Sequence, residues 1–327
     1  MEMNLRWLKL AEYIKYYSRE DKEPHFYHAF LLVPTFLRRG PQSILSFIRF
    51  VKCNKFNGQL FSSSNNPEIE ILFVVASKDF KILPESISRA VGNSINSISK
   101  ITIITRSVDV SMCEKLINEL KFKIPVTVLN EDDVIIESDR VKLKTKFKEN
   151  YGWILQQLLT VDYILKSSSK GVLAIDADTI MMQNTLWLNS KGEQILLVSH
   201  EYHKPYYQFL RNINLIKYMP DYTFITHHML FQPEKLKNIW GKVGVYNITD
   251  VVHILVENDN LKPLSPVCLE FEPYAQGLML NFPSQVVLSR FCNIRLSAKS
   301  HQLDLAASIE RLEDEGLYKS VSFHSWS

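Results

Sequence analysis

The sequence contains few glycines, ten among 327 residues, and none of them builds a phosphate-binding loop. Neither GxGxxG nor GxxxxGK followed by Ser or Thr occurs, so a nucleotide bound by this chain must be held by other groups. The four cysteines are scattered without a CxxC spacing, which indicates neither a disulfide framework nor a zinc site. A reducing compartment fits this cysteine usage best.

Long apolar runs and a strong excess of one charge are also absent. No apolar run approaches the ~20 residues of a membrane span, and no basic-led apolar segment with a small-residue cleavage site opens the chain. We therefore expect a cytoplasmic protein. The formal net charge of +3 is too small to indicate nucleic acid as a partner. With 46% hydrophobic and 22% charged residues, the composition is that of a globular domain with a sizeable core.

The first 65 residues differ in pattern from the rest of the chain. Apolar residues recur at helical spacing from Leu5 onward, and positions 1–60 hold ten Lys and Arg residues against five Asp and Glu. Such a segment fits peripheral contact with the anionic cytoplasmic face of a membrane, but amphipathic helices more often face a core, which favours a helical extension packed on the main domain. The polar cluster at 61–67 predicts the boundary. We expect a helical extension over 1–65 and one domain over 66–327.

Beyond this boundary, stretches typical of strands and helices alternate. Strands are expected at 69–76, 100–105 and 126–129, and helices at 83–98 and 111–120. This alternation predicts parallel β-α-β units, and hence an α/β fold with a mainly parallel sheet flanked by helices. Ligands of such sheets bind at the carboxyl ends of the strands. That edge carries Ala76-Ser77-Lys78-Asp79 and the segment that begins at Arg106.

An acidic pair follows a further apolar strand, in the segment Gly171-Val-Leu-Ala-Ile-Asp-Ala-Asp-Thr. Residues two apart share one face of a strand, so Asp176 and Asp178 can converge, and like charges that close need a cation between them. Mg²⁺ and Mn²⁺ are usually held by one or two carboxylates plus substrate phosphates. The alternative interpretation is a strand-to-loop turn in which Asp is merely a turn former.

Polar residues also stand out in two other apolar segments. The helix expected at 151–165 carries Gln156 and Gln157 shortly before the Asp strand, where amides either bind hydroxyl groups or lie on the surface. The strand-like run 224–231 contains a Thr-His-His triplet at 226–228. Polar residues inside a buried run mark either a hydrogen-bonded core cluster or the lining of a site.

Taken together, these motifs resemble the GT-A nucleotide-sugar glycosyltransferases. They are more closely similar to a little-characterised bacterial glycosyltransferase-like family found among surface-polysaccharide genes. The likeness covers about 69–327 and depends on the order of the motifs. They are Ala76-Ser77-Lys78-Asp79, Tyr151-Gly152-Trp153-Ile154-Leu155-Gln156-Gln157-Leu158, Asp176-Ala177-Asp178-Thr179, Phe224-Ile225-Thr226-His227-His228-Met229, Glu270-Phe271-Glu272-Pro273-Tyr274 and, near the end of the sequence, His324.

The resemblance implies a GT-A-like, Rossmann-like fold and a DxD-type glycosyltransferase. Such an enzyme moves a sugar from a nucleotide-sugar donor to a hydroxyl of a glycan or lipid-linked acceptor, here in bacterial surface-polysaccharide synthesis. By this resemblance Asp178 and His324 bind Mn²⁺ or Mg²⁺ that bridges the diphosphate. Asp176 joins them through water or the donor ribose.

On the donor side, the resemblance implies that Ala76, Ser77 and Asp79 hold the nucleoside. Two further residues are candidates for binding the donor. Arg106 lies on the same predicted sheet edge, and the amide of Gln156 stands shortly before the Asp strand. No dense cluster of Lys and Arg replaces the metal as the counter-charge for a nucleoside diphosphate leaving group.

On the acceptor side, Glu270 and Glu272 lie where GT-A enzymes often keep an acidic residue that faces the acceptor. A carboxylate there can accept the proton of the attacking hydroxyl if the anomeric centre is inverted. Leu269 and Pro273 depart from the Ser-Glu-Tyr-Glu-Leu-Tyr form that the resemblance leads us to expect.

Two other functions compete with this interpretation. An Asp-nucleophile phosphatase or phosphotransferase also uses Asp-x-Asp after a strand. Such an enzyme requires Thr or Val at the position where this chain has Ile180. It also requires an acidic pair downstream of the motif, whereas the adjacent acidic pair of this chain, Asp132-Asp133, lies upstream. The second competitor is a non-catalytic protein of the same fold that binds sugar or nucleotide, because fold alone does not establish activity.

Overall fold

The computed structural model describes residues 49, 53, 65–199, 201–262, 265–297, 305–315 and 318–324. Almost all of the predicted helical extension therefore lies outside the described residues. Its helical form, its contact with a membrane and the domain boundary near residue 65 stay predictions. None of the described helices is both long and apolar enough to cross a membrane.

A five-stranded sheet forms the centre of the fold, in the order β3-β2-β1-β4-β7. The strands are β1 Ile69–Val74, β2 Ile98–Thr105, β3 Val126–Asn130, β4 Val172–Asp176 and β7 His228–Phe231. β1 pairs in parallel with β2 and β4, β2 pairs in parallel with β3, and β7 alone runs antiparallel, next to β4. The predicted mixed α/β fold with a mainly parallel central sheet flanked by helices is confirmed.

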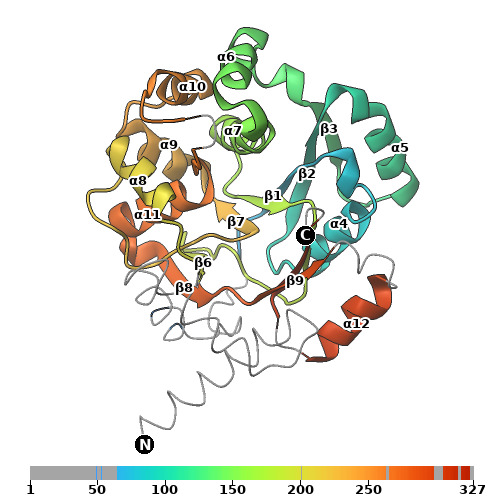
Figure 1. Ribbon diagram of the computed structural model, residues 1–327. Helices are drawn as coiled ribbons and strands as arrows, with labels where there is room; N and C mark the ends of the chain where they lie inside the picture. The colour runs from blue at the N-terminus through green and yellow to red at the C-terminus, as the bar shows by residue number, and fades with distance from the viewer. Residues whose placement is uncertain are drawn as a thin grey trace, which may run out of the picture.

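Helices cover both faces of this sheet because its strands are apolar on both faces (Figure 1). Ile71 and Phe73 of β1 pack on the side of α4 and α5, whereas Leu72 packs on the side of α7. The helices are α4 Leu83–Gly92, α5 Val110–Leu120, α6 Glu137–Phe147, α7 Tyr151–Lys166, α8 Lys204–Asn212, α9 Pro233–Gly241, α10 Ile248–Glu257, α11 Phe271–Asn281 and α12 Leu305–Glu315.

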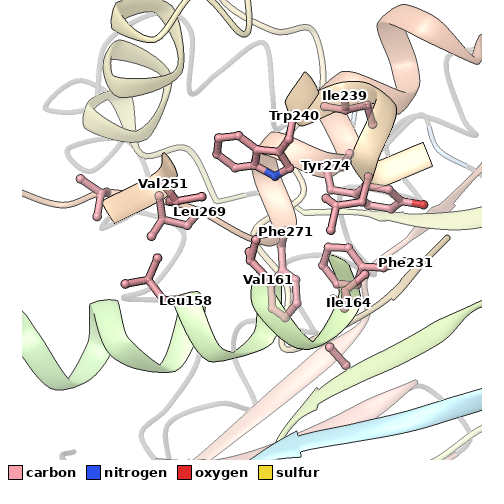
Figure 2. Packing of buried hydrophobic residues seen from close by; sticks show 14 of the residues in the cluster. Leu158, Val161, Ile164, Phe231, Ile239, Trp240, Val251, Leu269, Phe271 and Tyr274 are labelled. Carbon is pink, nitrogen blue, oxygen red and sulfur yellow. The ribbon is translucent and has the colours of Figure 1, made fainter. Parts of the chain in front are cut away.

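Figure 2 shows the larger core, in which Val161 and Ile164 of α7 lie near Phe231 of β7 and Phe271 of α11. α11 also packs closely against α9. A Cβ atom at Gly277 would lie 2.4 Å from Cγ2 of Ile239, so this helix crossing requires glycine. The packing fixes the start of α11, and with it the Glu270 to Glu272 segment, against α7.

Two small sheets connect the second half of the chain to the edge of the central sheet. β6 Gln194–Val198 pairs in parallel with β8 Val286–Arg290, and β10 Ser320–His324 lies between β5 Thr179–Met181 and β9 Asn293–Ser297. The amide of Phe323 in β10 donates to the carbonyl of Asp178 at 2.9 Å. The strand at 320–324 thus lies against the turn that carries the second Asp of the motif.

Three of the expected elements are shorter than predicted. The strand expected at 69–76 ends at Val74. The helix expected at 83–98 ends at Gly92 with Asn93 as its C-cap, because glycine is a poor helix former and β2 begins at Ile98. Of the strand-like run 224–231 only β7 is a strand, and the residues before it form a loop.

Candidate active site

A cavity of about 410 Å³ opens at the carboxyl ends of β1 and β4. Its position agrees with the rule that ligands of α/β sheets bind beyond the carboxyl ends of parallel strands. The cavity is lined by Val74, Ala76, Lys78, Asp79, Trp153, Gln156, Gln157, Asp176, Ala177, Asp178, Glu201, Tyr206, Ile225, Thr226, His227, Cys268, Glu270, Phe271, Glu272 and Arg295.

Both acidic residues of the motif line this cavity. Asp176 is the last residue of β4, whereas Asp178 lies in the two-residue turn that leads into β5. The strand alternation that predicted their convergence therefore ends at Asp176. The turn brings Asp178 to the cavity instead, held there by the backbone contact with β10.

A third carboxylate, Asp79, belongs to the same cluster. It lies in the short 3-10 helix Ser77–Asp79 that follows β1. Burial raises the pKa of Asp79 to about 6, Lys78 lowers it, and the negative charges of Asp178 and Asp176 raise it further. The influence of both charges on Asp79 shows that the three carboxylates lie within electrostatic reach of one another.

His227 is one of the cavity residues that sequence reasoning did not assign to the site. Its Nδ1 lies 3.0 Å from Oδ2 of Asp176. Burial lowers the pKa of His227, but the hydrogen bond to Asp176 and the charges of Asp176 and Asp178 together outweigh burial, so its pKa is raised overall. The only signal in the sequence was the polar triplet at 226–228 inside an apolar run, which was compatible with a site lining.

The two predicted acceptor-side glutamates have different surroundings. Glu270, the N-cap residue of α11, is 9% exposed and lines the cavity. Burial raises its pKa to about 8, the charge of Asp176 contributes, and a hydrogen bond with Thr160 lowers it. A carboxyl group with this pKa changes its protonation state near neutral pH, as an acid-base group of an enzyme requires.

The Glu272 side chain, by contrast, is fully buried and satisfied. It accepts hydrogen bonds from the Tyr207 hydroxyl at 2.8 Å, the Phe224 amide at 2.6 Å and Nε2 of Gln276 at 2.9 Å. Burial raises its pKa to about 7, although these three bonds lower it. Glu272 therefore connects α8, the loop before β7 and α11 through these hydrogen bonds.

The predicted donor-side residues lie close together at the end of β1. Ala76 lines the cavity, and Nη2 of Arg106 donates to the Ser77 hydroxyl at 2.8 Å. Nε of Arg106 also donates to Oδ2 of Asp109 at 2.7 Å, which fixes the guanidinium beside the cavity. Ser77 and Arg106 adjoin the cavity rather than line it.

The paired amides Gln156 and Gln157 both line the cavity, but they are held differently. Oε1 of Gln157 accepts a hydrogen bond from the Leu269 amide at 2.8 Å, so this buried side chain positions the segment before Glu270. Gln156, which is only partly buried, is the amide left to face a ligand.

Aromatic rings and an ion pair complete the lining. Trp153 of α7 stacks on Tyr206 of α8 with ring centroids 6.1 Å apart. Arg295 of β9 forms an ion pair with Glu201.

His324, the predicted third metal ligand, is the last residue of β10. Its backbone pairs with Ser297 and directly follows Phe323, whose amide contacts Asp178. The side chain of His324 lies outside the described part of the chain. Within that part, no three His, Cys, Asp or Glu side chains are arranged to hold a metal ion by themselves.

No protein-family model and no curated protein sequence matches the chain. Solved structures that do match include the apo form of mouse xyloside xylosyltransferase 1, at 12% identity over 78% of this chain and 97% of that one, with a TM-score of 0.44.

Two further matches are also glycosyltransferases. The bifunctional glycosyltransferase WbbM is 10% identical over 81% of this chain and 47% of its own, with a TM-score of 0.41. The galactosyltransferase LgtC, solved in complex with donor and acceptor sugar analogs, is 9% identical over 79% of this chain and 87% of its own, with a TM-score of 0.41. Each of the three alignments leaves about a fifth of this chain uncovered.

Proposed function

We propose that the chain is a glycosyltransferase that moves a sugar from a nucleotide-sugar donor to a hydroxyl group of an acceptor with the help of Mn²⁺ or Mg²⁺. The observation that carries this proposal is the convergence of Asp79, Asp176 and Asp178 in one cavity at the carboxyl ends of parallel strands. Such a cluster of acidic oxygens suits a hard divalent cation and the phosphates that the cation binds.

The residues present fit a metal ion. Asp176 and Asp178 line the cavity, and their negative charges add to burial in raising the pKa of Asp79, so a cation bound there would offset the repulsion among the three carboxylates. Mg²⁺ and Mn²⁺ are commonly held by one or two carboxylates plus substrate oxygens, so a cage made only of protein ligands is not needed. When bound, the metal would act as a Lewis acid that neutralises the diphosphate leaving group. We assign Asp178, Asp176 and His324 to it.

His227 prepares Asp176 for this role. The hydrogen bond at 3.0 Å fixes the orientation of the carboxylate, as outer-shell partners do in metal sites. On the donor side we assign Ala76, Ser77 and Asp79 to the nucleoside. The guanidinium of Arg106, held by Ser77 and Asp109, supplies a fixed positive charge beside them.

Glu270 is the group that we assign to proton transfer. It lies on the cavity lining within electrostatic reach of Asp176, and its raised pKa allows it to accept a proton from an acceptor hydroxyl near neutral pH. Glu272, with its three hydrogen bonds, acts as a positioning residue for the start of α11. Gln156 is assigned to a hydroxyl group of the bound sugar.

The biological setting that we propose comes from the motif resemblance. The acceptor is a glycan or a lipid-linked glycan in bacterial surface-polysaccharide synthesis, and the basic segment 1–65 brings the enzyme to the inner face of the membrane.

A screen of nucleoside diphosphates tests the proposed function. A ligand that binds only the folded state raises the thermal unfolding midpoint, so a diphosphate should raise it more with Mn²⁺ than without. Release of nucleoside diphosphate from nucleotide-sugars should also depend on Mn²⁺. If the diphosphate binds but no nucleotide-sugar is turned over, the protein is the non-catalytic sugar or nucleotide binder. Hydrolysis of p-nitrophenyl phosphate without any nucleotide-sugar turnover would instead support the Asp-nucleophile phosphatase.

A further inference from the structure

One wall of the cavity is aromatic. Trp153, in the first turn of α7, and Tyr206, in the first turn of α8, both line it, and their rings are inclined by only 22°. The ring of His203 packs edge-on against Tyr206 with centroids 4.5 Å apart. Together Trp153 and Tyr206 form an aromatic surface, which we call the aromatic wall, in a cavity otherwise rich in carboxylates.

Glu270 lines the same cavity as the aromatic wall. Burial is the main cause of the raised pKa of Tyr206, and the charge of Glu270 is among the further causes, so the two side chains lie within electrostatic reach of each other. A molecule packed on the wall therefore shares the cavity with the carboxyl group of Glu270, and its hydroxyl groups can be directed toward it.

The charges around the wall disfavour an anionic occupant. Among the residues that line the cavity the only Lys and Arg side chains are Lys78, which is 3.8 Å from Oδ2 of Asp79, and Arg295, which is paired with Glu201. Both cations already neutralise carboxylates. A carboxylated or phosphorylated acceptor at the wall would find no uncommitted positive charge among these lining residues, and it would be repelled by the ionised carboxylates.

An uncharged pyranose ring matches both features of this region. One face of such a ring presents C–H groups, which pack on an aromatic face, while its edge presents hydroxyl groups, which hydrogen-bond to a carboxyl group. Trp153 remains 37% exposed, so part of its ring is open to a ligand, whereas Trp187 and Trp240 are fully buried in the core.

We infer that the aromatic wall of Trp153 and Tyr206 is the acceptor subsite and that it binds an uncharged pyranose residue with its hydroxyl groups toward Glu270. This inference rests on the proposed glycosyltransferase function and narrows its acceptor to a neutral glycan end.

Saturation-transfer NMR on the full chain tests it. The probes are the methyl pyranosides of glucose, galactose and mannose, with methyl glucuronide as the charged member, each measured with and without Mn²⁺ and a mixture of UDP and GDP. Trp153→Ala should weaken binding of at least one neutral pyranoside about tenfold or more, and Trp153→Phe should restore part of it. Tyr218→Ala is the matched control, because Tyr218 is an aromatic residue that is 83% exposed and outside the cavity lining.

The outcomes separate this inference from the proposed function. Equal binding of a neutral pyranoside by the wild type and Trp153→Ala, at matching thermal unfolding midpoints, overturns the subsite. Failure of the wild type to bind any pyranoside under either condition also overturns it, and glucuronide binding as tight as that of glucoside overturns its charge preference. The proposed function fails separately, if no nucleoside diphosphate stabilises the wild type in the presence of Mn²⁺.

Discussion

Replacement of Glu270 by Gln should make the stability of the protein less dependent on pH. Burial and the charge of Asp176 raise the pKa of this carboxyl group in the folded chain from 4.5 to about 8. In the unfolded chain the group ionises near its ordinary pKa, so the folded state loses relative stability as the pH rises from 4.5 to 8. Below this window both states are protonated, and above it both are ionised. The cost of burying the carboxylate is therefore fully present only at high pH.

The magnitude follows from the same pKa. Each unit of pKa corresponds to about 1.36 kcal/mol, so a rise from 4.5 to about 8 lowers the free energy of unfolding by about 5 kcal/mol between these pH values. Gln has nearly the shape of the protonated acid and does not ionise. The variant Glu270→Gln should thus resemble the wild type at pH 4.5 and exceed its stability by several kcal/mol at pH 9.

Urea unfolding followed by circular dichroism at pH 5, 7 and 9 measures this difference. Other titrating groups, Glu272 among them, occur in both proteins and cancel when the variant is compared with the wild type. Glu234→Gln is the control for removal of a charge, because Glu234 is 86% exposed. If the stability of Glu270→Gln and that of the wild type changed in parallel from pH 5 to pH 9, this would refute the argument that burial destabilises the ionised form of Glu270.

The remaining predictions concern activity and location. Asp178→Asn should reduce sugar transfer on the order of 100-fold or more, because the site loses a charged oxygen ligand, and Asp176→Asn should reduce it nearly as much. The thermal unfolding midpoint of both variants should stay close to that of the wild type. Wild-type turnover by either variant at saturating Mn²⁺ would contradict the metal assignment. Transfer should increase from pH 6 to pH 9 as Glu270 ionises with its pKa of about 8, and a flat profile would remove Glu270 from proton transfer. The full chain should co-sediment with anionic liposomes at low salt and be released at high salt, unlike a chain that begins at Asn66; equal, negligible pelleting of both would leave 1–65 without a membrane role.

The sequence predicted the sheet well because its strands are short apolar runs, of which β1 and β4 are buried along most of their length, separated by amphipathic helices. The strands expected at 100–105 and 126–129 are found within a residue or two of their predicted ends. The helix expected at 83–98 was too long, although Gly92-Asn93 carried a stop signal that periodicity alone does not weigh.

The partners within the site could not be predicted from residue types. His227 reaches Asp176 because β7 runs antiparallel to β4 with His228 opposite Ile175, so that the carbonyl of His227 accepts from the Asp176 amide at 2.9 Å. A single antiparallel strand in a parallel sheet depends on long-range packing that local pattern does not encode. Glu270 and Glu272 likewise appear equivalent in sequence and both line the cavity, yet the Glu272 carboxylate is fully buried and accepts three hydrogen bonds from neighbouring core groups.

The strand β10 has a consequence for the biosynthesis of this protein. It inserts between β5 and β9, where the Ser322 hydroxyl hydrogen-bonds to Thr179, a residue 143 positions earlier in the chain. The central sheet is complete once His228–Phe231 has emerged from the ribosome, but the turn that holds Asp178 gains its backbone partner only when residue 323 is available. Domains generally fold as units. The turn that carries Asp178 therefore cannot reach its final form until synthesis has passed this strand.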